Sequence, residues 1–509
     1  MWGSLFLFIS NQLSTSININ NMETKDGYEK ELNLHIERER AAVKLQSKVG
    51  ELLYDKGIEL VLFRNHLTDI TISEILNLHE YAKQVVNKPI DVFTTAALAE
   101  TLMTLDIPAS KLDIGLLASE WLAGHTEQSG MARFLMEKLG DLQTPQAIEP
   151  RDVVLYGFGR IGRLAARELI KQAGKGQQLR LRAIVTRGSS DADIIKRASL
   201  LRNDSVHGAF KGSVIEDLAN KSLIINGQIV HMIDATNPED IDYTAYGIHN
   251  ALIIDNTGVF TNREALSRHM QAKGVGKVLL TAPGKEIPNV VYGINQHTLD
   301  VENETIFSAA SCTTNAISPI LKVINDHFGV VKGHIETVHA YTNDQNLLDN
   351  MHKKPRRGRS AAVNMVITST GAGSAVTKVI PELKDKLTAN AVRVPTPNGS
   401  LAILSLELNS QVSLEQVNAA IKDAALHGEL VNQIYYSFDP ELVSSDIIGN
   451  TCCSVFDSNA SIVSVDGKNV VLYAWYDNEF GYTKQVIRLA KYVTQVRRAI
   501  YYWCKKKSP

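Results

Sequence analysis

A cysteine and a histidine in the second half of the chain have the types and the setting for covalent chemistry. Cys312 stands in the segment SCTTN (311–315), directly before an apparent helix over 316–325. A helix N-terminus stabilises a thiolate. His339 follows at the expected end of a strand, and a Cys–His pair supports nucleophilic attack on a carbonyl. The alternative is that both are structural, since buried cysteines are commonly inert.

A glycine pattern earlier in the chain predicts a phosphate-binding loop. Gly157, Gly159 and Gly162 form GxGxxG between a strand expected at 152–156 and a following helix. The first glycine permits a tight turn, the second lets the backbone approach a pyrophosphate, and the third lets helix and strand pack closely. The helix N-terminus adds free N–H groups. The pattern alone is weak, but in this context it predicts a dinucleotide.

The second strand of this unit, expected at 181–186, lacks the acidic residue that holds the ribose hydroxyls of NAD. Thr186 ends it, and Arg187 follows. Without a carboxylate a ribose 2′-phosphate is not repelled, and Arg187 could attract it. Arg187 could equally be a solvated loop charge, so the cofactor is NAD or NADP.

The elements around these residues predict an α/β protein. Apolar runs at 152–156, 181–186, 251–254 and 277–280 alternate with helical segments, as in a parallel Rossmann sheet. We expect a disordered leader, a helical N-terminal extension and a linker over 1–150, with Met22 as a candidate start. The dinucleotide-binding domain should span 151–311, completed by a C-terminal helix at 476–500. An α+β catalytic domain should span 312–475, with a strand at 401–408.

Composition excludes several functional classes. The 509 residues are 44% hydrophobic and 21% charged, with a net charge of −2, so no basic field favours nucleic acid or an anionic membrane. Four cysteines, two of them adjacent, make a poor disulfide framework and favour the cytoplasm. No apolar stretch approaches the ~20 residues of a membrane span. No CxxC or HExxH motif suggests a metal site.

The chain resembles glyceraldehyde-3-phosphate dehydrogenase over about 152–496. The matching segments stand in the family's order: YGFGRIGR (156–163), NDSVHG (203–208), NTGVF (256–260), SCTTN (311–315), TVHAYTNDQ (337–345), STGAG (369–373), RVPTPNGS (393–400), VSSDIIGN (443–450) and WYDNEFGY (475–482). The first 150 residues resemble the extra segment of long-form bacterial members. Tyr156 and Thr186 depart from the family's NAD-preferring pattern, and Asn350 and Met351 match neither common cofactor pattern.

The resemblance implies the oxidation of glyceraldehyde 3-phosphate to 1,3-bisphosphoglycerate through a cysteine thioester. Cys312 would attack the aldehyde as a thiolate paired with His339, which then acts as general base. Inorganic phosphate would release the acyl group. By resemblance Thr342 and Arg393 bind the substrate phosphate. The attacking phosphate would meet Ser311, Thr313, Thr370 and Gly371.

The resemblance also implies the cofactor contacts and the assembly. Arg160 and Ile161 match the family's pyrophosphate contacts, and Thr257 and Gly258 match its adenosine-side loop. Asn478 matches the residue that holds the nicotinamide carboxamide, with Tyr482 nearby. The basic loop 353–359 matches an element that reaches a neighbouring subunit, which implies a homotetramer.

Two other readings of the chain stay open. Erythrose-4-phosphate dehydrogenase shares the Cys–His chemistry but typically lacks the STGA segment, which stands here at 369–372. A regulatory or binding role through the N-terminal helices is the second. Whether the enzyme serves glycolysis or gluconeogenesis is not contained in these patterns.

Overall fold

The chain forms two units in the computed structural model, which describes residues 25–84, 86–124, 130–140, 142 and 149–501. The first unit contains the N-terminal part through residue 143 and a short C-terminal segment; the second contains residues 144–499. The expected leader, with Met22, and most of the expected linker lie outside the described residues. None of the described helices is long and apolar enough to cross a membrane.

The N-terminal unit combines helices with a small sheet, whereas the sequence pattern indicated helices alone. Its sheet has the order β2-β1-β3-β20, and α4 packs against β1. The elements are α1 (Lys25–Glu51), β1 (Glu59–Leu62), β2 (Asn65–His66), α2 (Ile72–Gln84), α3 (Val92–Thr104), β3 (Ser110–Asp113), α4 (Ile114–Gly124), α5 (Met131–Leu139) and β20 (Ala499–Tyr501). The strands are too short to show an alternating pattern, and β20 comes from the opposite end of the chain.

A single buried carboxylate joins two pieces of this unit. Asp113 accepts the N–H groups of Gly115 and Leu116 at the start of α4, at 3.0 and 3.1 Å, and that of Phe63 at 2.9 Å. Phe63 and Arg64 both have positive φ, so the turn after β1 needs such an external acceptor. Asp113 therefore fixes both the helix start and the turn.

The second unit begins with a dinucleotide-binding sheet of order β11-β10-β9-β4-β5-β8-β7-β6. Its six strands from β11 to β8 are parallel, and β7 and β6 continue antiparallel. The elements are β4 (Arg151–Tyr156), α6 (Arg160–Ile170), β5 (Leu179–Thr186), α7 (Asp191–Arg202), β6 (Val214–Asp217), β7 (Ser222–Ile225), β8 (Gln228–Asp234), β9 (Ala251–Asp255), α8 (Arg263–Met270), β10 (Val275–Leu280), β11 (Ile306–Ser308) and α12 (Phe480–Val493). The chain order reverses beside β4, and ligands of such sheets bind at the carboxyl ends of strands at this switch point.

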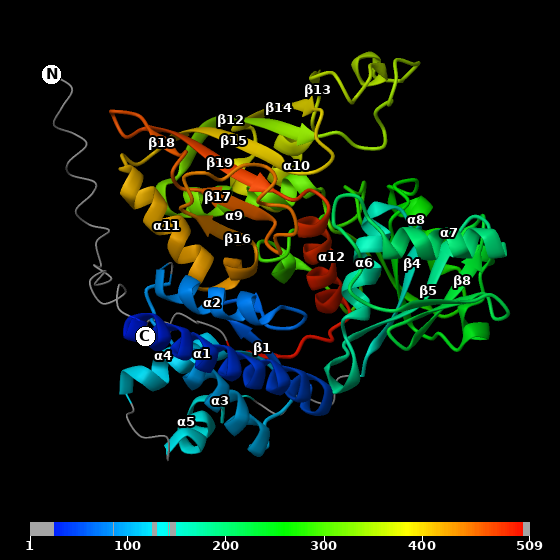
Figure 1. Cartoon of the computed structure of the whole chain (residues 1–509). Helices are drawn as coiled ribbons and strands as arrows, with labels where there is room; N and C mark the ends of the chain where they lie inside the picture. Colours follow the sequence, from blue (N-terminus) through cyan, green and yellow to red (C-terminus); the bar gives the residue numbers. More distant parts are fainter. Residues whose placement is uncertain (1–24, 85, 125–129, 141, 143–148, 502–509) are drawn as a thin grey trace. The chain divides into compact units, whose positions relative to one another are not determined.

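Alternate residues of these strands enter two cores. Val153 and Leu155 pack with α6, α7 and α12, while Val154 and Tyr156 pack on the other face, which α8 covers. Burial on both faces explains the continuous apolar runs of the sequence. Helix α12 lies against α6 (Figure 1). The C-terminal helix is shorter than the expected 476–500, because Tyr476 still belongs to a strand and β20 begins at Ala499.

The rest of the second unit is a second sheet with helices packed on it. Its order is β13-β14-β12-β15-β19-β17-β16, and β18 also pairs with β19. The elements are α9 (Cys312–Phe328), β12 (Val330–Ala340), β13 (Val366–Thr368), α10 (Ala372–Val379), β14 (Leu387–Val394), β15 (Ser400–Leu408), α11 (Leu414–Leu426), β16 (Ile434–Ser437), β17 (Ser454–Asp457), β18 (Ile462–Val463) and β19 (Asn469–Tyr476). The core between sheet and helices fixes the start of α9 relative to the end of β12.

Candidate active site

Cys312 and His339 lie together, although they come from different elements. Cys312 is the first residue of α9, and the hydroxyl of the N-cap residue Ser311 accepts the N–H of Thr314 at 3.0 Å. His339 is the last residue but one of β12. Sγ of Cys312 is 3.6 Å from Nε2 of His339. The structure thus brings the two residues singled out in the sequence within reach of a proton transfer.

The surroundings of the pair favour its uncharged form. Burial raises the pKa of the Cys312 thiol, although the charge of Arg393 acts in the opposite direction. Burial, followed by the charge of Arg393, lowers the pKa of His339 to about 3. These shifts run against the resting thiolate–imidazolium pair that the sequence suggested. Burial is the main cause of both shifts, and the neighbouring guanidinium, whose position depends on strand pairing, adds to the shift of His339.

Strand register sets Arg393 beside the histidine. In the parallel pair β12–β14, His339 is opposite Arg393. Nη1 of Arg393 is 3.0 Å from Nδ1 of His339 and donates to the carbonyl of Ala340 at 2.8 Å. Nδ1 of His339 is itself 2.7 Å from that carbonyl. In the tautomer that carries hydrogen on Nδ1, Nε2 presents its lone pair to Cys312, as a general base requires.

Arg393 also reaches the first predicted anion pocket. Its Nη1 is 3.3 Å from the hydroxyl of Thr342, which donates to Asp344. Arg357 forms an ion pair with Asp344, and its Nε donates to Thr368 at 3.1 Å. Arg357 therefore joins this group, a role that the sequence analysis missed. The signal was the basic run 353–359, for which subunit contact, phosphate contact and simple solvation were all open, without Arg357 being singled out.

The residues predicted for the second anion pocket lie at two helix N-termini. Ser311 and Thr313 lie at the start of α9, and Thr370 and Gly371 directly precede α10, which packs against α9. The hydroxyl of Thr370 accepts the N–H of Ala372 at 3.2 Å. Thr313 is buried, and its hydroxyl is 3.1 Å from that of Tyr476. Helix N-termini with hydroxyl neighbours suit an anion.

The glycine loop has the shape that a dinucleotide requires. Gly157 has a φ of 93°, and a Cβ there would lie 3.0 Å from the side chain of Thr257. A Cβ at Gly162 would lie 2.5 Å from the carbonyl oxygen of Gly157, whereas Gly159 faces open space. Gly159 directly precedes α6. The backbone therefore leaves room for a pyrophosphate at the helix N-terminus, and the residues present fit NAD(P).

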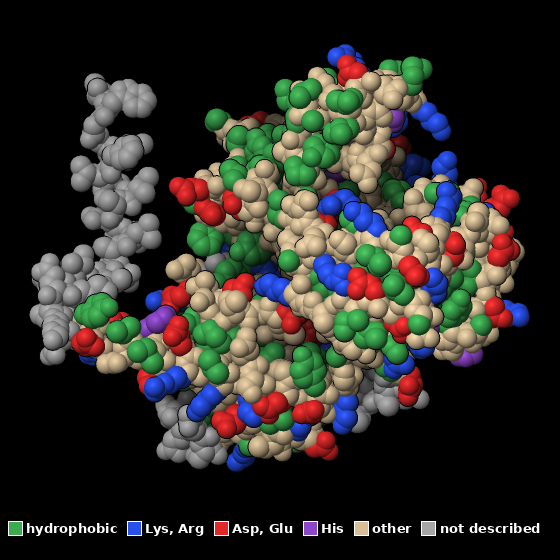
Figure 2. Space-filling view, turned by 45° about the vertical axis from the view of Figure 1, so that its right-hand side comes forward, with side chains coloured by type: hydrophobic (Ala, Val, Ile, Leu, Met, Phe, Trp, Pro, Cys, Tyr) green, Lys and Arg blue, Asp and Glu red, His purple; other side chains and the backbone are tan. Residues whose placement is uncertain are grey.

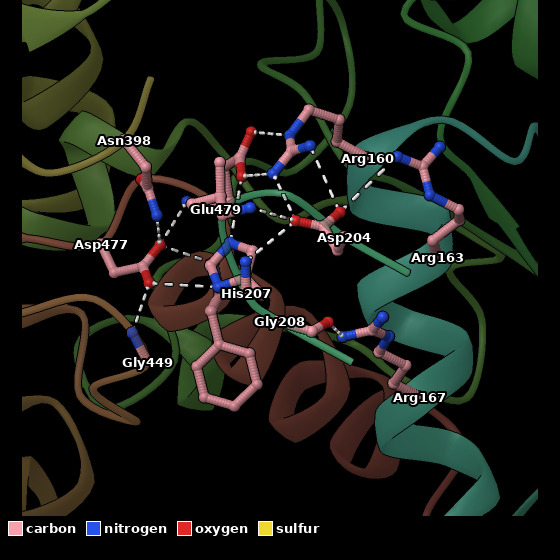
Figure 3. A network of polar contacts seen from close by, with 12 residues as sticks. Arg160, Arg163, Arg167, Asp204, His207, Gly208, Asn398, Gly449, Asp477 and Glu479 are labelled. Atoms are coloured by element: carbon pink, nitrogen blue, oxygen red, sulfur yellow. Dashed lines mark hydrogen bonds and ion pairs between the residues drawn. The ribbon is translucent and has the colours of Figure 1, made fainter. Parts of the chain in front are cut away.

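The guanidinium of Arg160 is bound by carboxylates of the protein and is therefore not free to bind a phosphate. It binds Glu479, with Nη2 at 2.5 Å from Oε2, and Asp204 at 3.2 Å (Figure 3). His207 adds a contact of 3.1 Å to the same oxygen of Glu479. Burial disfavours charge on Glu479, but the bonds from His207 and Arg160 outweigh it and hold its pKa below the usual range. Ile161 follows half-buried on α6.

This network ties the glycine loop to the segment that carries Asn478. Asp477 accepts the side-chain amide of Asn398 and the N–H of Gly449, both at 2.8 Å (Figure 3). The Oδ1 atom of Asn478 accepts the hydroxyl of Ser400 at 2.8 Å, and Ser400 also accepts the N–H of Ala340 at 3.1 Å. Ser400 thus links Asn478 to the strand of His339. The sequence analysis did not single it out.

The remaining predicted residues lie in two regions, one beside Cys312 and one at the ends of β4 and β5. Tyr482, on α12, donates its hydroxyl to the carbonyl of Ala310 at 2.9 Å and so holds the backbone before Cys312. Arg187 and Thr257 line a cavity at the ends of β4 and β5, and Gly258 follows directly. No cluster of metal-ligating side chains occurs among the described residues.

Comparison with known proteins agrees with this geometry. Residues 151–263 match the model for the glyceraldehyde 3-phosphate dehydrogenase NAD-binding domain, and residues 311–478 match that for its C-terminal domain. A glyceraldehyde-3-phosphate dehydrogenase-like protein of Pseudomonas aeruginosa (strain UCBPP-PA14) is 45% identical over 447 residues, 87% of this chain and 96% of that protein. Glyceraldehyde-3-phosphate dehydrogenase 1 of Bacillus subtilis (strain 168) is 41% identical over 344 residues, 67% of this chain and 98% of that protein.

These matches differ in extent. The match to the Bacillus protein has about the length of the second unit, whereas the match to the Pseudomonas protein is longer than that unit and so enters the N-terminal one. At least part of the N-terminal unit is thus shared with a relative. With both family domains present, the chain belongs to the glyceraldehyde-3-phosphate dehydrogenase family.

Proposed function

We propose that the chain oxidises glyceraldehyde 3-phosphate to 1,3-bisphosphoglycerate, with inorganic phosphate as the second substrate. The observation that carries this proposal is the Cys312–His339 pair, 3.6 Å apart, between two groups suited to anions. One group contains Arg393, Thr342 and Arg357, and the other contains the N-termini of α9 and α10. A phosphorylated aldehyde and free phosphate need two such pockets on either side of a nucleophile.

In the proposed mechanism, Sγ of Cys312 attacks the aldehyde carbon while Nε2 of His339 takes the thiol proton. The N–H of Cys312, free at the first position of α9, donates to the developing oxyanion. His339 then gives this proton to the oxyanion, which forms the hydroxyl of the hemithioacetal, and takes it back as hydride leaves the carbon. It returns the proton to Sγ when the acyl group leaves Cys312. The hydride acceptor would be supplied by NAD(P), for which Asn478 and the start of α6 are the proposed contacts. Phosphate held at the second pocket attacks the resulting thioester and regenerates Cys312.

Other residues of the chain position the reactants. Asn478, oriented by Ser400, holds the nicotinamide carboxamide, while the N–H groups at the start of α6 receive the pyrophosphate. Arg160 acts by fixing Glu479, and not through a phosphate contact of its guanidinium. Residues 151–311 with α12 serve as the cofactor domain, and 312–475 as the catalytic domain.

We also propose a homotetramer, supported by an apolar surface on the loop between β12 and β13. Five large hydrophobic side chains of this loop are between 73% and 92% exposed: Leu347, Leu348, Met351, Val363 and Met365. Figure 2 shows hydrophobic side chains gathered at the top of the molecule, where Figure 1 shows this loop. A surface of this kind is typical of a protein interface.

A steady-state assay of the purified chain tests the reaction. We expect dinucleotide reduction with glyceraldehyde 3-phosphate that depends on added phosphate and is faster than with erythrose 4-phosphate. Cys452→Ser, at a buried cysteine away from the pair, serves as the control for Cys312→Ser. A clear preference for erythrose 4-phosphate, or turnover independent of phosphate, would contradict the proposal.

A further inference from the structure

A cavity of about 400 Å³ opens where β4, β5 and β8 end, beside the glycine loop. Twelve of the described residues line it, among them Tyr156, Thr186 and Phe260. Two of the twelve are arginines, Arg187 and Arg197, and none is Asp or Glu. This is the place where a Rossmann sheet receives the adenosine ribose of its dinucleotide. The charge there is therefore positive, which is opposite to that of an NAD site.

Arg197 was not foreseen from the sequence, and apart from a long ion pair with Asp193, at 3.7 Å, its Nη1 has no acceptor in the protein. It lies on α7, and its Nη2 donates to the carbonyl of Arg187 at 2.8 Å. Its Nη1 is buried without a hydrogen-bond partner, and the side chain is 18% exposed. A buried donor without an acceptor is unfavourable. An anionic oxygen entering the cavity would provide the missing acceptor.

The carboxylates nearest to this turn are engaged in holding it. Asp234 ends β8 opposite Thr186, and its Oδ1 accepts the N–H of Gly188 at 2.7 Å. Asp193 caps α7 together with Ser190, and its Oδ1 is 3.7 Å from Nη1 of Arg197, beyond hydrogen-bond distance. Neither carboxylate lines the cavity. The acidic group that would bind ribose hydroxyls and repel a phosphate is thus absent from the described lining.

We propose that Arg187 and Arg197 bind the 2′-phosphate of NADP(H), so that this chain prefers NADP(H) over NAD(H). Arg197 is the fixed half of the pair, because its bond to the carbonyl of Arg187 holds the guanidinium beside the turn. Arg187 is exposed in the loop after β5. Its guanidinium contacts the phosphate from that side. The inference deepens the proposed function, since it names the form of the cofactor that the same site takes.

Calorimetric titration of the full chain with adenosine 2′,5′-bisphosphate and with 5′-AMP tests this without turnover. Charge-assisted bonds to one phosphate correspond to about a 10- to 100-fold difference in affinity. We therefore expect the bisphosphate to bind at least about 10-fold more tightly. Arg197→Gln should remove most of this preference and leave the affinity for 5′-AMP unchanged. Lys196→Gln, an exposed neighbour on the same helix, is the matched control for loss of charge.

Thr186→Asp is a second test, which adds a negative charge where Arg197→Gln removes a positive one. It keeps the inference testable if Arg197→Gln does not fold. The new carboxylate lies in the lining and should weaken binding of the bisphosphate far more than that of 5′-AMP. Equal affinities in the wild type, or full preference retained in Arg197→Gln, would overturn the inference. A chain that prefers the bisphosphate but does not oxidise glyceraldehyde 3-phosphate would uphold this inference and refute the proposed reaction. Oxidation of glyceraldehyde 3-phosphate with NAD, together with equal affinities for the bisphosphate and 5′-AMP, would uphold the proposed reaction and refute this inference.

Discussion

Ser400→Ala tests whether a buried hydroxyl sets the orientation of the nicotinamide-binding amide. Ser400 is 1% exposed, accepts the N–H of Ala340 at 3.1 Å and donates to Oδ1 of Asn478 at 2.8 Å. With that oxygen occupied, Nδ2 of Asn478 is directed away to serve the cofactor. The substitution removes both bonds and leaves the amide free to turn over.

The size of the effect follows from the two bonds. Losing the donor to Asn478 costs about 0.5–1.5 kcal/mol, which corresponds to a rise of about 2- to 10-fold in the KM for the dinucleotide. The buried N–H of Ala340 is left without an acceptor, which lowers the free energy of unfolding by a further ~1–3 kcal/mol. The KM effect and the stability effect therefore arise at different atoms and can be separated.

Initial-rate kinetics and urea unfolding measure the two effects. Ser400→Thr keeps the hydroxyl, so it should restore the KM even where its added methyl lowers stability. Ser267→Ala is the control, because that hydroxyl bonds only within its own helix, to the carbonyl of Glu264 at 2.7 Å. An unchanged KM in Ser400→Ala, with the expected loss of stability, would refute the positioning role and leave a structural one.

Five further experiments test the site and the assembly. Cys312→Ser should lose nearly all turnover while its affinity for the dinucleotide, measured by calorimetry, stays unchanged; substantial residual oxidation would exclude the thioester. His339→Asn should slow turnover by about 10²–10⁴-fold. Because its pKa lies near 3, His339 is neutral above pH 5, so alkylation of wild-type Cys312 should rise with pH through a raised thiol pKa; a plateau below pH 7 would reveal a resting ion pair. Arg357→Gln should raise the KM for glyceraldehyde 3-phosphate more than it lowers kcat, and an effect on kcat alone would place Arg357 outside the substrate pocket. The pair Leu348→Ser and Met351→Ser should shift a tetramer to smaller species in light scattering, and an unchanged mass would remove this loop from the interface.

Local sequence predicted the parts of the molecule that local interactions form. The strand, glycine loop and helix over 151–170 follow from an apolar run, three spaced glycines and an amphipathic segment. The strand expected at 401–408 occurs as β15, one residue longer. In contrast, the expected C-terminal helix began too early. Asp477 accepts the N–H groups of Glu479 and Phe480 at 2.9 and 2.7 Å and so starts the helix only at Phe480.

Contacts between segments distant in the chain could not be predicted from local sequence patterns. Arg393 was singled out only by resemblance, and its contact with His339 depends on the register of β12 and β14. Neither Arg357 nor Arg197 was singled out from the sequence, because only the folded loop and helix place them against Thr368 and the carbonyl of Arg187. The lowered pKa of His339 follows mainly from its burial and then from the charge of Arg393, so the protonation state of the pair could not be inferred from sequence spacing.

The pairing of β3 with β20 has a consequence for biosynthesis. The first unit obtains the edge strand of its sheet, Ala499–Tyr501, only after the whole second unit has been translated. Until then, β3 presents unpaired backbone groups, which are a template for wrong partners. Closing a contact between opposite ends of the chain also carries a large entropic cost and is slow. The N-terminal unit is therefore the first to emerge from the ribosome and the last to be completed, and a nascent chain is most exposed to aggregation through that edge.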